Sequence, residues 1–134
     1  MSFYILPSNS ISGTSVWESG NSANSIVQNR TSNKPIAIKP DSLVFGEFSY
    51  ADGNYATIIG SGSTSTTENS LIIGGNNNQI SGLGNNAIIA GNNNTIDAPS
   101  LNVVLIGVND VHITGLTGNL LVTQALRLLG TTFT

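Results

Sequence analysis

Few residues of this sequence belong to the types that carry out acid–base or metal chemistry. The 134 residues include seven acidic side chains, four basic ones, one histidine and no cysteine. The lack of cysteine removes disulfides and thiolate metal sites from consideration. The net charge of −3 gives no basic footprint for nucleic acid, so we expect no nucleic-acid partner.

Two carboxylates, Asp97 and Asp110, are near enough in the sequence to be weighed as a catalytic pair. They are 13 residues apart, and a glycosidase needs two carboxyl groups about 5 to 9.5 Å apart. No basic residue stands near either carboxylate, and nothing in the sequence places both in one cleft. We therefore predict that the protein is not an enzyme and that it has no catalytic residues and no cofactor.

His112 stands between Val111 and Ile113. On a threefold axis, one histidine from each of three chains would give three imidazoles, which is a set that can hold a transition metal. Because side chains alternate along a strand, His112 points outward if Ile113 points inward. A lone histidine is more often a surface residue, so we predict no metal site and keep His112 as the candidate ligand if one exists.

The chain between Val44 and Ile113 repeats a short motif that must position these side chains. Residues 72–80 read IIGGNNNQI, and residues 88–96 read IIAGNNNTI at an offset of 16. Looser copies on both sides give five copies in all, at spacings of 14, 14, 16 and 17 residues. A unit this short cannot bury its own apolar face and must stack on its neighbours. The copies begin at Val44, Ile58, Ile72, Ile88 and Leu105.

Each copy places strand-forming residues directly beside turn-forming residues. Short strands joined by tight corners coil a chain into a β-solenoid. Asparagine suits the corners because it tolerates the left-handed backbone conformation. In a stack the asparagine runs of neighbouring copies lie near each other, so their amides can form hydrogen-bonded ladders. The predicted ladder consists of Asn76, Asn77, Asn78, Asn92, Asn93 and Asn94.

Adjacent apolar pairs in the motif predict association between chains. Successive strand side chains point to opposite faces, so each pair puts one apolar residue on either face of a coil. Burying one aliphatic side chain contributes roughly 1.5 to 3 kcal/mol, and a continuous exposed strip usually marks an interface. We expect one member to fill the solenoid and the other to pack against sister chains; burial of both within one chain is the alternative. The pairs are Ile58 and Ile59, Ile72 and Ile73, Ile88 and Ile89, and Leu105 and Ile106.

The motif over residues 42–115 resembles the repeats of two groups of trimeric proteins. Units of the type Ile-Ile-Gly-Asn-Asn-Asn-x-Ile are similar to the trimeric β-helices of bacteriophage tail fibres and spikes. They are also similar to the head repeats of trimeric autotransporter adhesins. The resemblance implies a homotrimeric fibrous appendage on the surface of a virion, joined to other virion proteins. A fragment of a bacterial cell-surface adhesin is the alternative.

The patterns divide the chain into three regions. Residues 1–41 are predicted to be an N-terminal attachment or capping region, residues 42–115 the β-helical repeat, and residues 116–134 a C-terminal cap or trimerisation segment. The first region either docks the rod on a larger assembly or blunts the end of the solenoid, and the two roles are compatible. No run of 18 apolar residues occurs, so we expect no membrane insertion.

The sequence therefore predicts an all-β, short-rung β-solenoid that forms a homotrimer. The predicted function is that of a structural fibre, spike or fibre tip involved in host attachment. Tyr50 and Tyr55 are the aromatic residues close to the rungs, which makes them the candidate contacts for a host receptor such as a glycan. Carbohydrate processing and ice binding are less favoured alternatives. Ice binding needs threonines at matched positions, and the positions matched to Thr66 are Ile80, Ile96 and Ile113.

Overall fold

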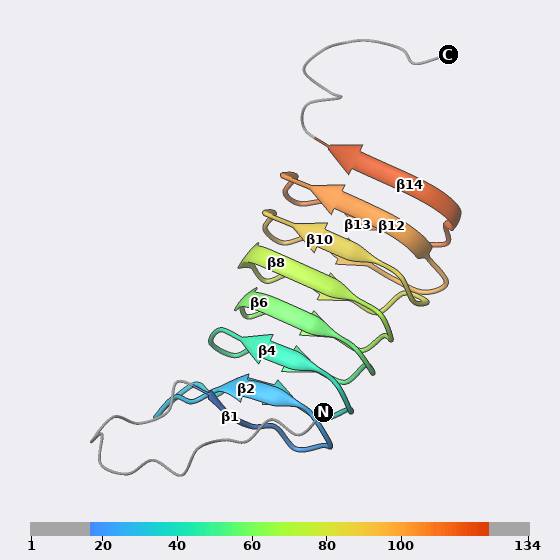
Figure 1. Cartoon of the computed structure of the whole chain (residues 1–134). Helices are drawn as coiled ribbons and strands as arrows, with labels where there is room; N and C mark the ends of the chain where they lie inside the picture. The colour runs from blue at the N-terminus through green and yellow to red at the C-terminus, as the bar shows by residue number, and fades with distance from the viewer. Residues whose placement is uncertain (1–16, 124–134) are drawn as a thin grey trace, which may run out of the picture.

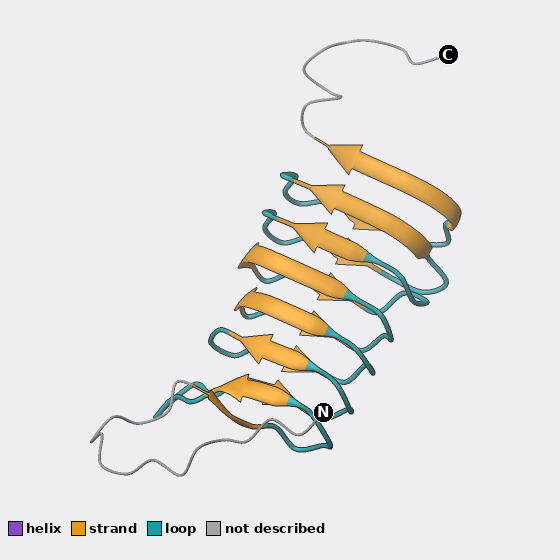
Figure 2. Ribbon diagram, in the orientation of Figure 1, coloured by secondary structure: helices purple, strands orange, loops and turns teal. Residues whose placement is uncertain are grey.

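The chain coils into a rod of stacked strands, as Figure 1 shows. The structure is a computed structural model that describes residues 17–123, and the outer parts of both predicted end regions, residues 1–16 and 124–134, lie outside the described residues. The described residues form a β-solenoid of about six turns and contain no helix (Figure 2). None of them therefore forms a helix that could cross a membrane. The predicted all-β solenoid is confirmed.

Two sheets make up the two long sides of the rod. The strands of sheet A are, in spatial order, β1 (Trp17–Ser19), β2 (Ile26–Gln28), β4 (Leu43–Phe45), β6 (Thr57–Ser61), β8 (Leu71–Asn76), β10 (Ala87–Ile89), β12 (Leu101–Ile106) and β14 (Thr117–Thr123). The strands of sheet B are β3 (Ile36–Ala37), β5 (Tyr50–Ala51), β7 (Thr64–Ser65), β9 (Gln79–Ile80), β11 (Thr95–Ile96) and β13 (His112–Ile113).

Neighbouring coils align residue for residue. In sheet A, Ile72 of β8 stands opposite Ile58 of β6 on one side and opposite Ile88 of β10 on the other. All pairs are parallel except β1 with β2, which are antiparallel, so β1 covers the first edge of sheet A with a strand of the opposite direction. Parallel pairing starts at β2 and reaches β14, and so extends past residues 41 and 115 on both sides. The three-part division of the chain stays a prediction.

A single row of side chains from each sheet fills the interior. The first residues of the apolar pairs in sheet A are fully buried, and the inward residues of sheet B face them across the coil. The N-terminal coils use small residues on sheet B, whereas the C-terminal coils use isoleucine. The core is therefore one narrow column along the rod. Its buried members are Val27, Val44, Ile58, Ile72, Ile88, Val103 and Leu105 from sheet A, Ala37, Ala51, Ser65, Ile80 and Ile96 from sheet B, and Ala56 and Val108 from the turns.

The coils turn at residues in the left-handed backbone conformation. Asn77 and Asn93, two residues before β9 and β11, have φ angles of 55° and 54°. The amide of Asn93 donates backward to the carbonyl of Asn76 in the preceding coil at 3.0 Å, whereas that of Thr95 donates forward to Val111 at 2.8 Å. These corners therefore bond neighbouring coils in both directions. The expectation that asparagine suits them is confirmed.

The predicted ladder residues on the inner side of the corners are buried and bridge coils. The Asn94 side chain is fully buried, and its Nδ2 donates to Asn78 Oδ1 at 3.1 Å and to the carbonyl of Val108 at 2.7 Å. Its Oδ1 accepts from the amide of Val111 at 3.1 Å. Asn78 likewise donates to the carbonyl of Gly91 at 2.6 Å. These amides supply hydrogen bonds to backbone groups that water cannot reach.

The other ladder residues are exposed. Nδ2 of Asn92 donates to the side chain of the next coil's Asn109 at 3.1 Å, and Nδ2 of Asn76 donates to Asn92 Oδ1 at 3.5 Å. Nδ2 of Asn93 donates to Asp110 at 3.1 Å. Asn77 joins the stack through its backbone amide, which donates to the carbonyl of Ser61 at 2.9 Å. Water competes for the side-chain bonds of this outer row, so each contributes less than a buried one.

The structure corrects one sequence alignment. Ser65, not Thr66, stands opposite Ile80. The reason is a shorter turn, because seven residues separate Ile58 from Ser65 where eight separate Ile72 from Ile80. A slip of one residue reverses the face of a strand side chain, so Thr66 lies outside the core. On the next coil the outward residues opposite Thr64 and Thr66 are Gln79 and Ser81, so the outer face of sheet B also lacks the matched threonines that ice binding needs.

Candidate functional site

The outer face of sheet A carries a continuous band of apolar side chains, called here the apolar strip. From β4 to β14, each sheet A strand has an outward residue before and after its inward one, so the strip has two rows that run along the rod. Strand β2 contributes only Ile26, because the residue after its buried Val27 is the polar Gln28. The first row is Ile26, Leu43, Thr57, Leu71, Ala87, Val104 and Leu121. The second row is Phe45, Ile59, Ile73, Ile89, Ile106 and Thr123. Two threonines are its polar members, and no member is charged.

The apolar pairs of the sequence are divided between the core and this strip. Their first members have no exposed surface, whereas Ile59, Ile73 and Ile106 expose 39%, 38% and 37% of theirs, and Ile89 is half-buried. Within one chain, then, the second member of each pair is not buried. The in-register stacking of the coils gathers these side chains into one surface instead of scattering them.

An aromatic pair stands at the N-terminal end of the strip. The rings of Trp17 in β1 and Phe45 in β4 are 5.1 Å apart between centroids and inclined at 50°. Trp17 is 47% exposed although it touches Phe45. The strip thus has large rings at one end and aliphatic side chains along the rest of its length.

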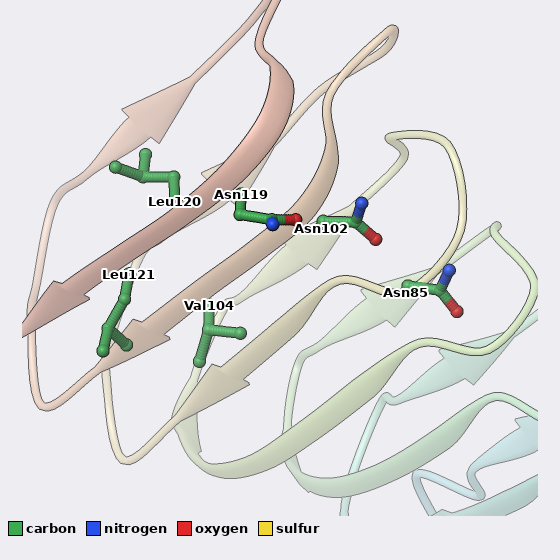
Figure 3. Close-up of a pocket in the computed structure, with 6 residues that line it drawn as sticks. All are labelled: Asn85, Asn102, Val104, Asn119, Leu120 and Leu121. Atoms are coloured by element: carbon green, nitrogen blue, oxygen red, sulfur yellow. The ribbon is translucent and has the colours of Figure 1, made fainter.

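A shallow hollow overlaps the C-terminal end of the strip, whose members Val104 and Leu121 help to line it (Figure 3). It has a volume of about 490 Å³. Its wall carries one asparagine from each of three successive coils, and its floor is aliphatic. No titratable side chain lines it, so it offers no group for acid–base catalysis. The lining residues are Asn85, Asn102, Val104, Asn119, Leu120 and Leu121.

The outer face of sheet B differs from the strip. From β7 to β13 its outward residues are polar, in contrast to the aliphatic ones of sheet A. Along these coils the rod therefore has one apolar and one polar long side, whereas the outward residues of sheet B nearer the N-terminus include the exposed Ile36 of β3 and Tyr50 of β5. The outward residues of this stretch are Thr64, Thr66, Gln79, Ser81, Thr95, Asp97, His112 and Thr114.

Three polar side chains on sheet B form a small cluster around Asp97. The Ser81 hydroxyl donates to Asp97 Oδ1 at 2.6 Å, and His112 Nε2 donates to Oδ2 at 2.7 Å. The Ser81 bond, followed by the His112 bond, holds the pKa of Asp97 below its ordinary value of 3.8. In a serine–histidine–aspartate triad the imidazole lies between the hydroxyl and the carboxylate. Here the carboxylate lies in the middle, so the imidazole of His112 does not contact the serine hydroxyl.

The structure does not bring together the other residues weighed for chemistry. Asp97 follows β11, whereas Asp110 precedes β13 at the opposite end of the sheet B strands, where it accepts from Asn93. His112 lies on sheet B, away from the apolar strip. Among residues 17–123, no group of three or more histidine, aspartate or glutamate side chains could hold a metal ion.

The two candidate receptor tyrosines both lie near β5. Tyr50 is half-buried and points out of sheet B, and Tyr55 is 60% exposed at the corner between β5 and β6. Phe48, which was not among the predicted site residues, is 65% exposed at the corner before β5. The signal that could have found it is its place in the repeat, because glycine, asparagine or aspartate stands there in later coils.

Comparisons of the chain with protein-family models, with curated proteins and with solved structures give no match. The class that the fold defines is that of a β-solenoid.

Proposed function

We propose that this protein is a structural rod that assembles into a homotrimer through its apolar strip. In this proposal it serves as a fibre, a spike or a fibre tip on the surface of a virion, in the manner of bacteriophage tail fibres. Its N-terminal region joins it to other virion proteins, and Tyr50 and Tyr55 contact the host receptor. The role needs no catalytic group, metal or cofactor.

The observation that carries the proposal is the difference between the two long sides of the rod. An aliphatic side chain that keeps about 40% of its surface exposed, as Ile59 and Ile73 do, would gain roughly 0.5 to 1 kcal/mol on complete burial. Such gains add up along the strip because its members touch. A contiguous exposed apolar band is the usual mark of an interface.

Rotational symmetry about an axis parallel to the rod suits this band. Such an arrangement sets the first row of one copy against the second row of the next at the same coil level. A threefold axis closes this head-to-tail contact and leaves no apolar row uncovered, as closed oligomers require. The absence of charge along both rows means that no like charges are brought together.

Solution mass tests the proposal. We expect light scattering on a sizing column to give three times the 13.9 kDa chain mass. Ile73→Lys places a charge in the strip and should give a folded monomer, because burying an unpaired ammonium costs several kcal/mol. Gln79→Lys is the matched control, since it adds the same charge to the opposite face of the same coil and should leave the mass unchanged.

A well-folded wild-type monomer at micromolar concentration would contradict the proposal. A stable dimer would keep the interface but remove the threefold symmetry. Receptor contact is tested separately with a glycan array, where Tyr55→Ala should weaken any binding that the wild type shows; unchanged binding would remove Tyr55 from the receptor site.

A further inference from the structure

The hollow at the C-terminal end of the apolar strip lies where the regular pairing of sheet A is interrupted. One extra residue in β14 shifts its register against β12 between Leu101 and Val103. Gly118 and Asn119 of β14 therefore stand opposite the single Asn102 of β12. Such a β-bulge bends its strand and redirects nearby side chains. The hollow lies at this bulge, because Asn102 and Asn119 both belong to its wall (Figure 3).

The floor of the hollow contains the most exposed member of the apolar strip. Leu121 of the first row is 53% exposed, whereas Ile26, the next most exposed member, reaches 46%. Val104 of the same row also lines the hollow, and no charged side chain does so. The hollow therefore favours an uncharged occupant that places an apolar side chain on this floor.

The proposed symmetry determines which part of a neighbouring copy faces the hollow. Rotation about an axis parallel to the rod involves no shift along it, so each coil of one copy meets the same coil of the next. The first row, which supplies Val104 and Leu121, then faces the second row of the neighbouring copy. Strand β12 crosses the middle of the hollow, and its second-row member is Ile106. This residue is aliphatic and 37% exposed.

The backbone beside Ile106 leaves room for the asparagine wall of the hollow. The next residue is Gly107, where an added Cβ would meet no atom of the chain within 4 Å. Glycine permits another backbone or side chain to come close. The asparagine amides of one copy can thus lie against the backbone at Gly107 of the next, while Ile106 covers the aliphatic floor. This gives an apolar centre with a polar rim, which is the usual composition of an interface.

We propose that the hollow of each copy receives Ile106 of the neighbouring copy. This inference rests on the homotrimer proposed above and identifies the contact that fills one site of its interface. The contact joins two different parts of the chain surface, so it is of the head-to-tail kind that closes into a ring. It also gives the β-bulge a role, since the bulge forms the recess that the isoleucine enters.

Cysteine pairing tests the contact, because the chain has no cysteine of its own. The full chain carries Asn119→Cys together with Ile106→Cys. Ile106 stands opposite Thr123, four residues from Asn119, which puts the two positions roughly 13 Å apart and out of reach of a disulfide within one chain. After oxidation, we expect a denaturing gel without reductant to show two and three times the 13.9 kDa chain mass. Asn119→Cys with Gln79→Cys, on the outer face of sheet B, is the matched control and should give single chains.

Two alanine variants test the same contact without cysteine. Ile106→Ala and Leu121→Ala should each weaken association about tenfold in a dilution series followed by light scattering, because they remove the side chain that enters the hollow or the floor that it covers. Leu83→Ala is the control, since Leu83 is also 53% exposed but lies outside the strip, and its association should equal that of the wild type.

Three results would overturn the inference. They are a trimer in which the paired cysteines form no links, links formed as efficiently by Ile106→Cys alone, and unchanged association for both Ile106→Ala and Leu121→Ala. The second would mean that Ile106 faces its own counterpart instead of the hollow. With a wild-type trimer, each of these results removes this contact and retains the proposed function. A wild-type monomer in light scattering would remove both.

Discussion

Replacement of Asn94 by alanine tests how far buried amides hold the coils together. The side chain of Asn94 is fully buried and bonds to groups in the coils on both sides. Asn94→Ala removes the donor to the Val108 carbonyl and the acceptor for the Val111 amide. Each buried group left without a partner costs about 1 to 3 kcal/mol. We therefore expect the free energy of unfolding to fall by about 2 to 6 kcal/mol.

Urea unfolding followed by circular dichroism, at a fixed protein concentration, measures this loss. A domain of this size has roughly 5 to 15 kcal/mol of stability in total, so the shift in midpoint will be large. Asn92→Ala is the matched control, because Asn92 lies in the same turn and also bonds to the next coil, but from an exposed position. Water replaces its lost bond, and we expect a cost under about 1 kcal/mol.

Equal losses for the two variants would refute this reasoning. They would mean that burial does not strengthen the contribution of the Asn94 hydrogen bonds over those of the exposed Asn92. A loss for Asn94→Ala below about 1 kcal/mol would show that the coils relax to satisfy the freed backbone groups.

Two further predictions concern the polar face and the corners. The pKa of Asp97 is lowered in the folded state, so its contribution to stability is present above the ordinary pKa of the carboxyl and is lost as the pH falls through the pKa in the folded state. The difference in urea midpoint between wild type and Asp97→Asn should therefore be constant from about pH 6 to 5 and shrink below about pH 4. A difference that grows in acid would contradict this sign. Gly75→Ala should be severely destabilising, since its φ is 76° and a Cβ there would come within 1.7 Å of the Gly91 carbonyl oxygen. Gly107→Ala, at a φ of 65° with open space around it, should lower the free energy of unfolding by only about 1 kcal/mol in urea unfolding. Equal losses for the two variants would show that backbone strain, and not the close approach of the Gly91 carbonyl, determines the cost of Gly75→Ala.

The repeated motif made the central coils predictable from the sequence. The large isoleucines of residues 58–106 predict both the strands and their two faces, and the asparagine runs predict the corners. The coils near the N-terminus carry no such signal, because their inward residues are small. Ala37 and Ala51 are fully buried, yet alanine is common in every kind of structure, and so the start of the solenoid could not be read from its residue types.

The lengths of the turns and the contacts between offset residues of neighbouring strands could not be predicted from the repeat. One residue fewer in the turn before β7 moved Thr66 out of the inward row, and nothing in the residue types records that deletion. The bond from His112 to Asp97 joins positions that are offset along the two strands, so matching equivalent positions does not find it. The left-handed corners at Phe48 and Tyr55 could not be predicted for another reason, because aromatic residues do not favour that conformation.

The sameness of the apolar strip bears on how neighbouring copies would align along the rod. Ile59, Ile73, Ile89 and Ile106 succeed each other at one-coil intervals in the second row. In this row a copy displaced by one whole coil would meet nearly the same side chains. The first row varies, with Thr57, Leu71 and Ala87 in successive coils, and the largest break in the sameness is the pair of rings at Trp17 and Phe45. The alignment of neighbouring copies along the rod would therefore be set at the N-terminal end. The aliphatic coils would stabilise the association without fixing this alignment.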